Sequence, residues 1–312
     1  MINCNLMPQE KAINAEKALA EAVEEKEKRV SSVKRKRVIN NTLIYILLVI
    51  LSIAWVIPVI MVFMVSIRNE AGVPITFIPQ DGYTWDNYVN LLTSNSYPFL
   101  HWFQNTLIVA ICVMLISTVF VFSVAYTMSR LRFKGRKGLM NINLVLGMFP
   151  GFMSMIAVYN ILKAVGLNGS LISLILIYSA SSGSGFYIAK GFFDTIPKSL
   201  DEAARIDGAN NFKVFYKIVL PLSKPIIVFT LLTSFMGPWV DYIYCSVILR
   251  DATENYTVAL GLYNMINNIE LLETNYTMFF AGSVLISIPI MVLFLLTQKY
   301  YVGGVTGGSV KG

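Results

Sequence analysis

The chain has 312 residues, of which 55% are hydrophobic and only 14% are charged, against about 25% in an average soluble domain. This composition excludes a disordered protein, a collagen-like chain and a disulfide scaffold. The apolar residues come in runs of about twenty that are separated by short polar stretches, as in membrane spans. The sequence therefore predicts an all-α polytopic membrane protein, and its one histidine, His101, leaves little scope for a metal site.

Six apolar runs are long enough to be spans, since about 20 helical residues cross the ~30 Å hydrocarbon core. They lie at 43–67, 105–128, 139–162, 171–189, 226–248 and 278–298. The first run follows a long polar segment, which excludes a cleaved signal peptide. Three prolines inside the runs, Pro58, Pro150 and Pro289, predict kinks. The chain divides into a charged tail (1–42), a six-helix domain (43–302) and a glycine-rich tail (303–312).

The charge distribution predicts the orientation in the membrane. Lysines and arginines lie almost entirely in 1–42, 129–138, 190–225 and after residue 298, and the three exceptions are Arg68, Lys163 and Arg250. The positive-inside rule places both termini and these basic segments in the cytoplasm. Residues 68–104, 163–170 and 249–277 are then outside. Because topology explains the net charge of +7, no nucleic-acid partner is expected.

Two polar segments have alternative interpretations. Residues 10–37 form either a solvated helix or a partly disordered tail, whose basic cluster 34–37 contacts anionic lipid, or a specific docking element. The outer segment 68–104 carries Trp85, Tyr88 and Tyr97. These aromatic residues are either interfacial anchors or part of a short helix that packs on the bundle.

The cytoplasmic segment 190–225 is patterned as a helix–turn–helix. Pro197 and Ser199 precede a helical stretch with Asp201 and Glu202 in its first turn, where carboxylates favour the helix dipole. Gly208 is expected to end this helix, and Asn210 and Asn211 are expected to cap a second helix. That second helix, 212–220, carries an apolar stripe formed by Phe212, Phe215, Tyr216 and Val219. Such an exposed stripe requires a partner surface.

The same segment carries a motif. The run Glu202-Ala203-Ala204-Arg205-Ile206-Asp207-Gly208-Ala209, followed by Ile218, Leu220-Pro221-Leu222 and Pro225, resembles the EAA loop of binding-protein-dependent ABC importer permeases. Arg132-Phe133-Lys134-Gly135 and Met148-Phe149-Pro150 resemble the carbohydrate branch of that family. The segment 249–261 and the ending Gly307-Gly308-Ser309-Val310-Lys311-Gly312 are similar to the maltose/maltodextrin (MalG-type) subunits, with Ser309 inserted. The similarity covers about residues 43–312.

The resemblance implies a type I (MetI-like) permease fold in a bacterial cytoplasmic membrane. It implies half of a translocation pore for an oligosaccharide, with a second permease subunit, two copies of an ATPase and an extracytoplasmic sugar-binding protein as partners. By resemblance, the loop contacts the ATPase through Glu202, Ala203, Ala204, Asp207, Gly208 and Pro221. The tail residues Gly308, Ser309, Val310 and Lys311 enter the ATPase dimer. The outer loop reaches the binding protein through Tyr256, Leu262, Tyr263 and Asn264.

The substrate path is less clear from the sequence. Asp241 is an acid inside a span, beside Tyr242 and Tyr244, and a carboxylate with aromatic rings suits sugar binding. A buried structural hydrogen bond is the alternative for Asp241. Ser182 lies in a run of small polar residues, 179–185, which lines a path or allows close helix packing.

No nucleotide-binding loop, nucleophile elbow or zinc pattern is present in the sequence, so we expect a non-catalytic subunit without a cofactor, with ATP bound by its partners. A secondary transporter predicts acids in several spans, and a channel predicts self-association around a pore. Neither predicts the loop 190–225. An ABC importer of another sugar or another small solute is the remaining alternative.

Overall fold

The computed structural model describes residues 7–73, 76, 78–149, 151–267 and 272–307. The chain divides into two compact units, residues 1–61 and 62–312. Regular structure in the described residues is helical, apart from one isolated β-bridge between Arg68 and Tyr83. The all-α class predicted from composition is therefore confirmed.

Helix α1 (Met7–Ser66) forms the first unit and runs into the second. The charged segment 10–37 is helical and continuous with the first apolar run. Thr42, just before that run, and Ser52 within it donate their hydroxyls to carbonyls one turn earlier, at 2.9 and 2.7 Å. Such bonds satisfy polar side chains where water is absent.

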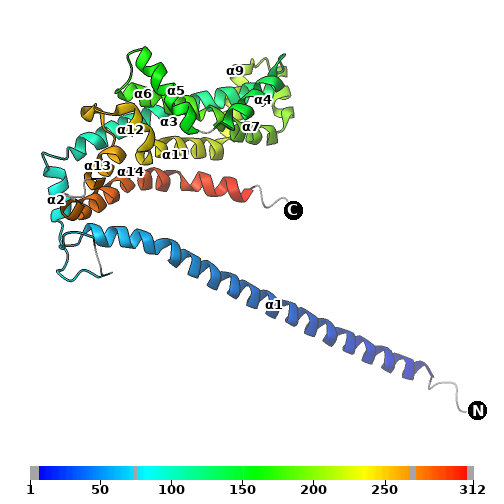
Figure 1. Cartoon of the computed structure of the whole chain (residues 1–312). Coiled ribbons are helices and arrows are strands. Elements are labelled where there is room, and N and C mark those ends of the chain that lie inside the picture. Colours follow the sequence, from blue (N-terminus) through cyan, green and yellow to red (C-terminus); the bar gives the residue numbers. More distant parts are fainter. Residues whose placement is uncertain (1–6, 74–75, 77, 150, 268–271, 308–312) are drawn as a thin grey trace, which may run out of the picture. The chain divides into compact units, whose positions relative to one another are not determined.

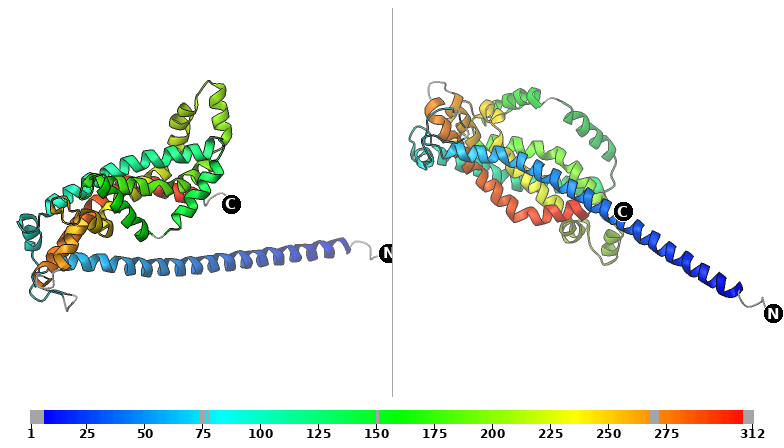
Figure 2. Two further views of the ribbon diagram at one scale, coloured as in Figure 1. Left: turned by 45° about the horizontal axis from the view of Figure 1, so that its top comes forward. Right: turned by 90° about the horizontal axis from the view of Figure 1, so that it is seen from below.

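The second unit contains every other helix. Its elements are α2 (Asp86–Thr93), α3 (Phe99–Arg130), α4 (Arg136–Gly147), α5 (Gly151–Ala164), α6 (Leu171–Ser181), η1 (Ser182–Gly185), α7 (Phe186–Thr195), α8 (Lys198–Ile206), α9 (Asn211–Val214), the π-helical turn η2 (Phe215–Val219), α10 (Leu220–Leu222), α11 (Lys224–Val240), α12 (Ile243–Leu249), η3 (Thr253–Asn255), α13 (Val258–Asn267) and α14 (Leu272–Gly307). Helix α3 packs against α6, α7 and α11, and α11 also packs against α14 (Figure 1). Helices α8 and α9 lie at one end of this unit, and α2 and α13 lie at the opposite end (Figure 2).

All six predicted spans lie in helical segments, but only three described helices are uninterrupted and long and apolar enough to cross a membrane. These are Arg35–Ser66, Phe99–Arg130 and Thr274–Tyr300. Two bent pairs, Leu171–Ser181 with Phe186–Thr195 and Asn211–Leu222 with Lys224–Val240, raise the number to five by length and composition. The bends are 41° and 83°.

The predicted spans 139–162 and 226–248 are each made of two helices, as is 171–189, which the bent pair of α6 and α7 forms. The first is divided between α4 and α5, around Pro150, which lies outside the described residues. The second breaks at Asp241, whose extended backbone ends α11 and whose carboxylate accepts a hydrogen bond from the Tyr244 amide at 3.0 Å, inside the first turn of α12. An aspartate in that position starts a new helix. Pro58 and Pro289, by contrast, lie inside the unbroken helices α1 and α14.

The aromatic segment 68–104 contains the short helix α2, which packs against α14, so the alternative of a packed helix applies here. Asn87 in α2 holds this end together. Its amide donates to the carbonyls of Ser66 and Arg68 at 3.0 and 2.7 Å, and its oxygen accepts from Thr277 at 3.0 Å.

Candidate functional sites

Helix α8, the first helix of the loop 190–225, begins after Pro197 as predicted. Its one buried side chain is Asp201, which forms an ion pair with Arg130, the last residue of α3. The Arg130 Nε and Asp201 Oδ2 atoms are 3.1 Å apart. Arg130 also donates from Nη2 to the Ile196 carbonyl at 2.9 Å, just before α8. The sequence explained Arg130 by topology alone and missed this contact, because its partner is distant in the chain.

The turn after α8 has the predicted geometry. Gly208 has φ of +78°, a left-handed conformation that glycine adopts without strain. Asn210 caps the second helix, since its Oδ1 accepts from the Lys213 amide at 2.8 Å. Asn211 is held from two sides: its carbonyl accepts from the Tyr126 hydroxyl of α3 at 2.9 Å, and its Oδ1 accepts from Arg205 at 2.8 Å. The turn is therefore fixed in place by hydrogen bonds.

The predicted apolar stripe of the second helix is divided between two faces. The π-helical turn η2 places Val214 and Val219 in the core, five residues apart, and leaves Phe212 and Tyr216 exposed. The sequence prediction failed here because it assumed regular α-helical spacing. Tyr216 and Pro221 line a groove of about 550 Å³ together with Lys217, Leu220, Lys224 and Ile227.

The predicted contact residues of this loop lie mostly on its outer surface. Glu202, Ala203, Asp207, Gly208 and Pro221 are exposed, and Ala204 is half-buried. Beside them lies an apolar edge that the chain does not cover, formed by Ile206, Phe212 and Tyr216, with 87%, 73% and 62% of their surface exposed. An exposed edge of this kind on a firmly held turn is suited to docking in a partner.

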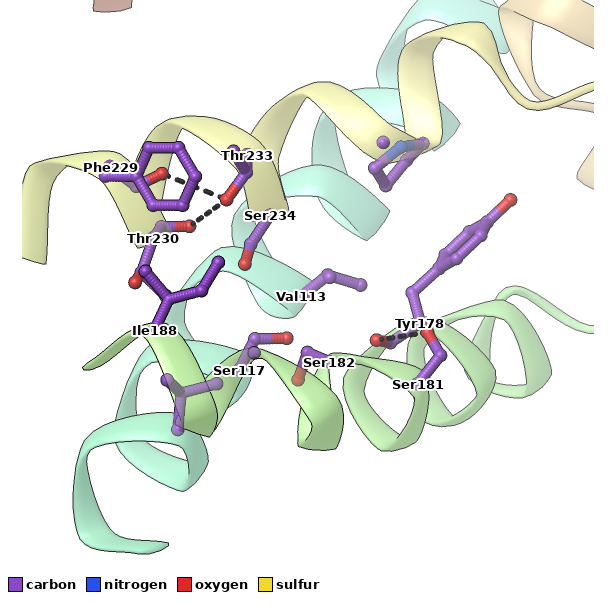
Figure 3. Close-up of a pocket in the computed structure, with 14 residues that line it drawn as sticks. Val113, Ser117, Tyr178, Ser181, Ser182, Ile188, Phe229, Thr230, Thr233 and Ser234 are labelled. Atoms are coloured by element: carbon purple, nitrogen blue, oxygen red, sulfur yellow. Dashed lines mark hydrogen bonds between the residues drawn. The ribbon is translucent and has the colours of Figure 1, made fainter. Parts of the chain in front are cut away.

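A cavity of about 280 Å³ lies between α3, the α6–α7 pair and α11. Hydroxyl groups from all three sides line it, as Figure 3 shows: Ser117, Ser181, Ser182, Thr230, Thr233 and Ser234. Small residues in and beside the break η1, Ser181, Ser182 and Gly185, form part of one wall. Ser117 is fully buried, and its Oγ has no hydrogen-bond partner among the described residues. The cavity therefore combines hydroxyls with apolar walls.

Of the four residues predicted for the substrate path, only Ser182 lines this cavity. Asp241 is half-buried and accepts hydrogen bonds from the Tyr178 hydroxyl at 3.1 Å and from the Tyr244 amide. Tyr242 stacks on Tyr263 with ring centroids 4.3 Å apart. Tyr244 donates to the Gly151 carbonyl at 3.4 Å.

Sequence reasoning missed several lining residues of the cavity. Its wall on α11 is formed by Thr230, Thr233, Ser234 and Gly237. Their spacing of three and four residues was a readable signal for one helix face.

The predicted outer loop 249–277 is largely an ordered part of the core. Helix α13 buries Leu262, and Gly261 lies so close to the Trp102 ring that an added Cβ would be 2.2 Å from it. Tyr256 is half-buried and donates its hydroxyl to the Arg250 carbonyl at 2.8 Å. Of the four residues predicted to contact a binding protein, Tyr263 and Asn264 are exposed.

The tail residues that the sequence predicts to contact the ATPase, Gly308, Ser309, Val310 and Lys311, lie outside the described residues. Within the described ranges, no group of three or more His, Cys, Asp or Glu side chains is arranged to hold a metal ion.

Comparison with known proteins identifies similar sequences over almost the whole chain. Residues 120–306 match the family described as binding-protein-dependent transport system inner membrane component. The galactooligosaccharides transport system permease protein GanQ of Bacillus subtilis is 35% identical over 285 residues, which cover 91% of this chain and 100% of the relative. The maltodextrin transport system permease protein MalD of Streptococcus pneumoniae is 35% identical, over 90% of this chain and 99% of the relative.

Solved structures show the same fold. A chain of a bacterial ABC transporter involved in the import of the acidic polysaccharide alginate superposes with a TM-score of 0.68 and 23% identity. The superposition covers 84% of this chain and 96% of that chain. A second structure, of a bacterial alginate ABC transporter in complex with an alginate pentasaccharide-bound periplasmic protein, gives a TM-score of 0.59 with 19% identity, over 84% and 94% of the two chains.

Proposed function

The chain belongs to the family of binding-protein-dependent transport system inner membrane components, and from this premise we propose that it is the permease subunit of an ATP-driven oligosaccharide importer. It forms half of the translocation pore beside a second, different permease subunit. Two copies of a cytosolic ATPase bind and hydrolyse ATP, and this chain is not itself catalytic. An extracytoplasmic binding protein delivers the sugar. Both termini lie in the cytoplasm, in accordance with the charge distribution.

One observation carries the proposal: the helix–turn–helix of α8 and α9 is anchored on its inner side and carries an uncovered apolar edge on its outer side. The anchors are the Arg130–Asp201 ion pair and the Tyr126–Asn211 hydrogen bond. The uncovered edge contains Ile206 and Phe212. An element that is fixed on the permease and apolar toward the cytoplasm is suited to transmit motion from the ATPase. The tail 308–311 is proposed to contact the same ATPase.

The sugar class is supported by the names of the relatives, which transport galactooligosaccharides and maltodextrin. The hydroxyl-lined cavity between α3, α6–α7 and α11 suits a polyol, since its hydroxyls can exchange hydrogen bonds with sugar hydroxyls while its apolar walls contact ring faces. Ser182 is the predicted path residue in that cavity. Tyr263 and Asn264 are the exposed residues that we assign to contact with the binding protein.

The test is transport by the reconstituted complex. The chain is purified with its co-purifying permease and ATPase subunits and placed in vesicles with the binding protein. We expect uptake of labelled maltotriose that requires ATP and the binding protein and that unlabelled maltodextrin suppresses. Unlabelled galactotriose tests competition by a different oligosaccharide, and an amino acid tests competition by a different class of solute. Uptake that only the amino acid suppresses would exclude an oligosaccharide importer.

Orientation is tested separately by labelling single cysteines in intact cells with an impermeant thiol reagent. Lys134→Cys lies in the segment 129–138, and Asn264→Cys lies on the proposed outer face; both positions are exposed in this chain. We expect the second to react and the first to be protected until the cells are opened. Labelling of Lys134→Cys in intact cells would reverse the proposed orientation.

A further inference from the structure

The attachment between α8 and α3 is concentrated in very few side chains. Arg130 and Asp201 are 2% and 9% exposed, and both are charged. Arg130 reaches Asp201 inside α8 and also the Ile196 carbonyl just before α8. One guanidinium group therefore contacts both the entry to α8 and its first turn. The pair joins residues that are far apart in the sequence, so it connects two elements rather than stabilising one helix.

Helix α8 has little else to hold it. Asp201 is its only buried side chain, and Ala204 is half-buried against the core. Its larger apolar residues, Leu200 and Ile206, are exposed. A displacement of α8 that moved Asp201 away from Arg130 while both side chains stayed buried would leave two uncompensated charges, which is strongly unfavourable. The pair therefore ties the position of α8 to the end of α3.

The partner helix α3 connects this end to the cavity. Tyr126 and Arg130 are four residues apart on one face of its last turns, and they hold α9 and α8 respectively. Farther along the same unbroken helix, Val113, Ser117 and Val121 form a wall of the cavity. The distance along α3 from Ser117 to Arg130 is about 20 Å at 1.5 Å per residue. A displacement of α8 is thereby carried to the cavity wall by one continuous helix.

We propose that Arg130 and Asp201 are positioning residues that couple ATPase-driven movement of α8 to α3 and so to the substrate cavity. This inference rests on the proposed function, which places the ATPase at α8. It assigns a specific role to a side chain of α3, which lies outside the loop. The Lys190–Asp194 ion pair joins two residues of the single helix α7, and Asp194 contacts α3 separately, by accepting a hydrogen bond from Ser129 at 2.6 Å. Lys190→Gln leaves that second contact in place, so it removes an ion pair without separating α7 from α3.

The experiment compares four variants in the intact complex in vesicles. Asp201→Asn leaves Arg130 buried without its partner. The double variant Arg130→Met/Asp201→Asn removes both charges, so a loss there does not come from an unpaired buried charge. Asp201→Glu keeps the charge, and Lys190→Gln, which breaks the ion pair within α7, is the control. The measured quantities are membrane insertion, ATPase co-purification, and the ratio of ATPase activity with and without loaded binding protein.

We expect the double variant to insert and to retain its ATPase, but to lose at least about fivefold of the stimulation by loaded binding protein, the lower end of typical allosteric coupling. Asp201→Glu should recover most of that stimulation, and Lys190→Gln should match the wild type. Wild-type stimulation in the double variant would overturn the proposal, even if Asp201→Asn fails to fold. Equal loss in Asp201→Glu and the double variant would also overturn it. The proposed function is tested independently by sugar uptake in the wild type.

Discussion

Helices α8 and α13 have nearly the same length, 9 and 10 residues, and lie at opposite ends of the second unit, yet their side chains are used in opposite ways. Helix α13 buries most of its apolar residues in its own chain, including Leu262 and Met265. Helix α8 buries only Asp201 and leaves Ile206 uncovered. The comparison shows that an apolar residue between spans indicates a partner only where the chain itself does not cover it.

The largest effect is expected where α13 is packed most closely. In Gly261→Ala, the new Cβ would be 2.2 to 2.6 Å from atoms of the Trp102 ring, which is itself buried. Because the buried Trp102 ring must shift to admit the Cβ, we expect the free energy of unfolding to fall by about 3 kcal/mol, the upper end of the range for overpacking. The measurement is thermal unfolding of the purified chain in detergent.

The control is Gly191→Ala in α7, where an added Cβ would meet no atom within 4 Å. That change should be neutral or stabilising, since alanine favours a helix over glycine by about 0.5–1 kcal/mol. If both substitutions gave the same unfolding temperature, α13 would not be packed as described.

The second effect concerns binding. Ile206→Asp places a charge on the most exposed large side chain of α8, so it should not affect the fold. We expect it to weaken association with the ATPase by about 2 kcal/mol, roughly 30-fold, as at the centre of an interface. Affinity of the purified subunits checks this. Val89→Asp, at an exposed site on α2, is the matched control and should bind the ATPase as the wild type does.

Helices α8 and α13 also show which features could be predicted from the sequence and which could not. The residues from Asp201 to Asn210 predicted α8, the turn at Gly208 and the cap of the second helix, because helix propensity, glycine and capping are local properties. Arg130 was missed because its partner is 71 positions away in the chain. Leu262 was assigned to an outer loop because nothing in its own segment shows that Gly261 leaves room for Trp102. Contacts between residues that are distant in the sequence decide whether such a side chain is buried or paired.

The same reasoning explains the broken spans. Hydropathy registers 226–248 as one apolar run, since a single acid hardly changes the average over about twenty residues. Asp241 nevertheless ends one helix and caps the next. The cavity was hidden for a related reason: Ser117, Ser182 and Thr233 come from three different helices, and only the fold brings them together.

A third prediction concerns the end that contains α2 and α13. Asn87→Ala removes one buried amide that bonds to Ser66, Arg68 and Thr277. We expect the free energy of unfolding to fall by about 1 kcal/mol, the lower end of the range for buried groups left without a hydrogen-bond partner. Asn90→Ala on the exposed side of α2 should leave the unfolding temperature unchanged. An equal loss in both variants would contradict the network around Asn87.

The smallest effect should depend on pH and be confined to the segment 67–83. The backbone amide of Asp81 donates to the Glu70 carboxylate at 3.0 Å and lowers the pKa of that group, with further contributions from the Gln80 amide and Arg68. Because the pKa in the folded segment lies below its usual value of 4.5, the stabilisation is fully present above that value and is lost as the pH falls through the lowered pKa. Hydrogen exchange of the Gln80 and Asp81 amides should therefore accelerate, relative to the intrinsic rate, only once the pH falls below the usual carboxyl pKa of 4.5. Glu70→Gln keeps a hydrogen-bond acceptor at this position but removes the charge. In this variant the Gln80 and Asp81 amides should exchange faster at neutral pH, and their exchange should show no acid transition. An acid transition that persists in Glu70→Gln would show that another group controls this segment, and an unchanged neutral rate would show that the carboxylate does not hold it.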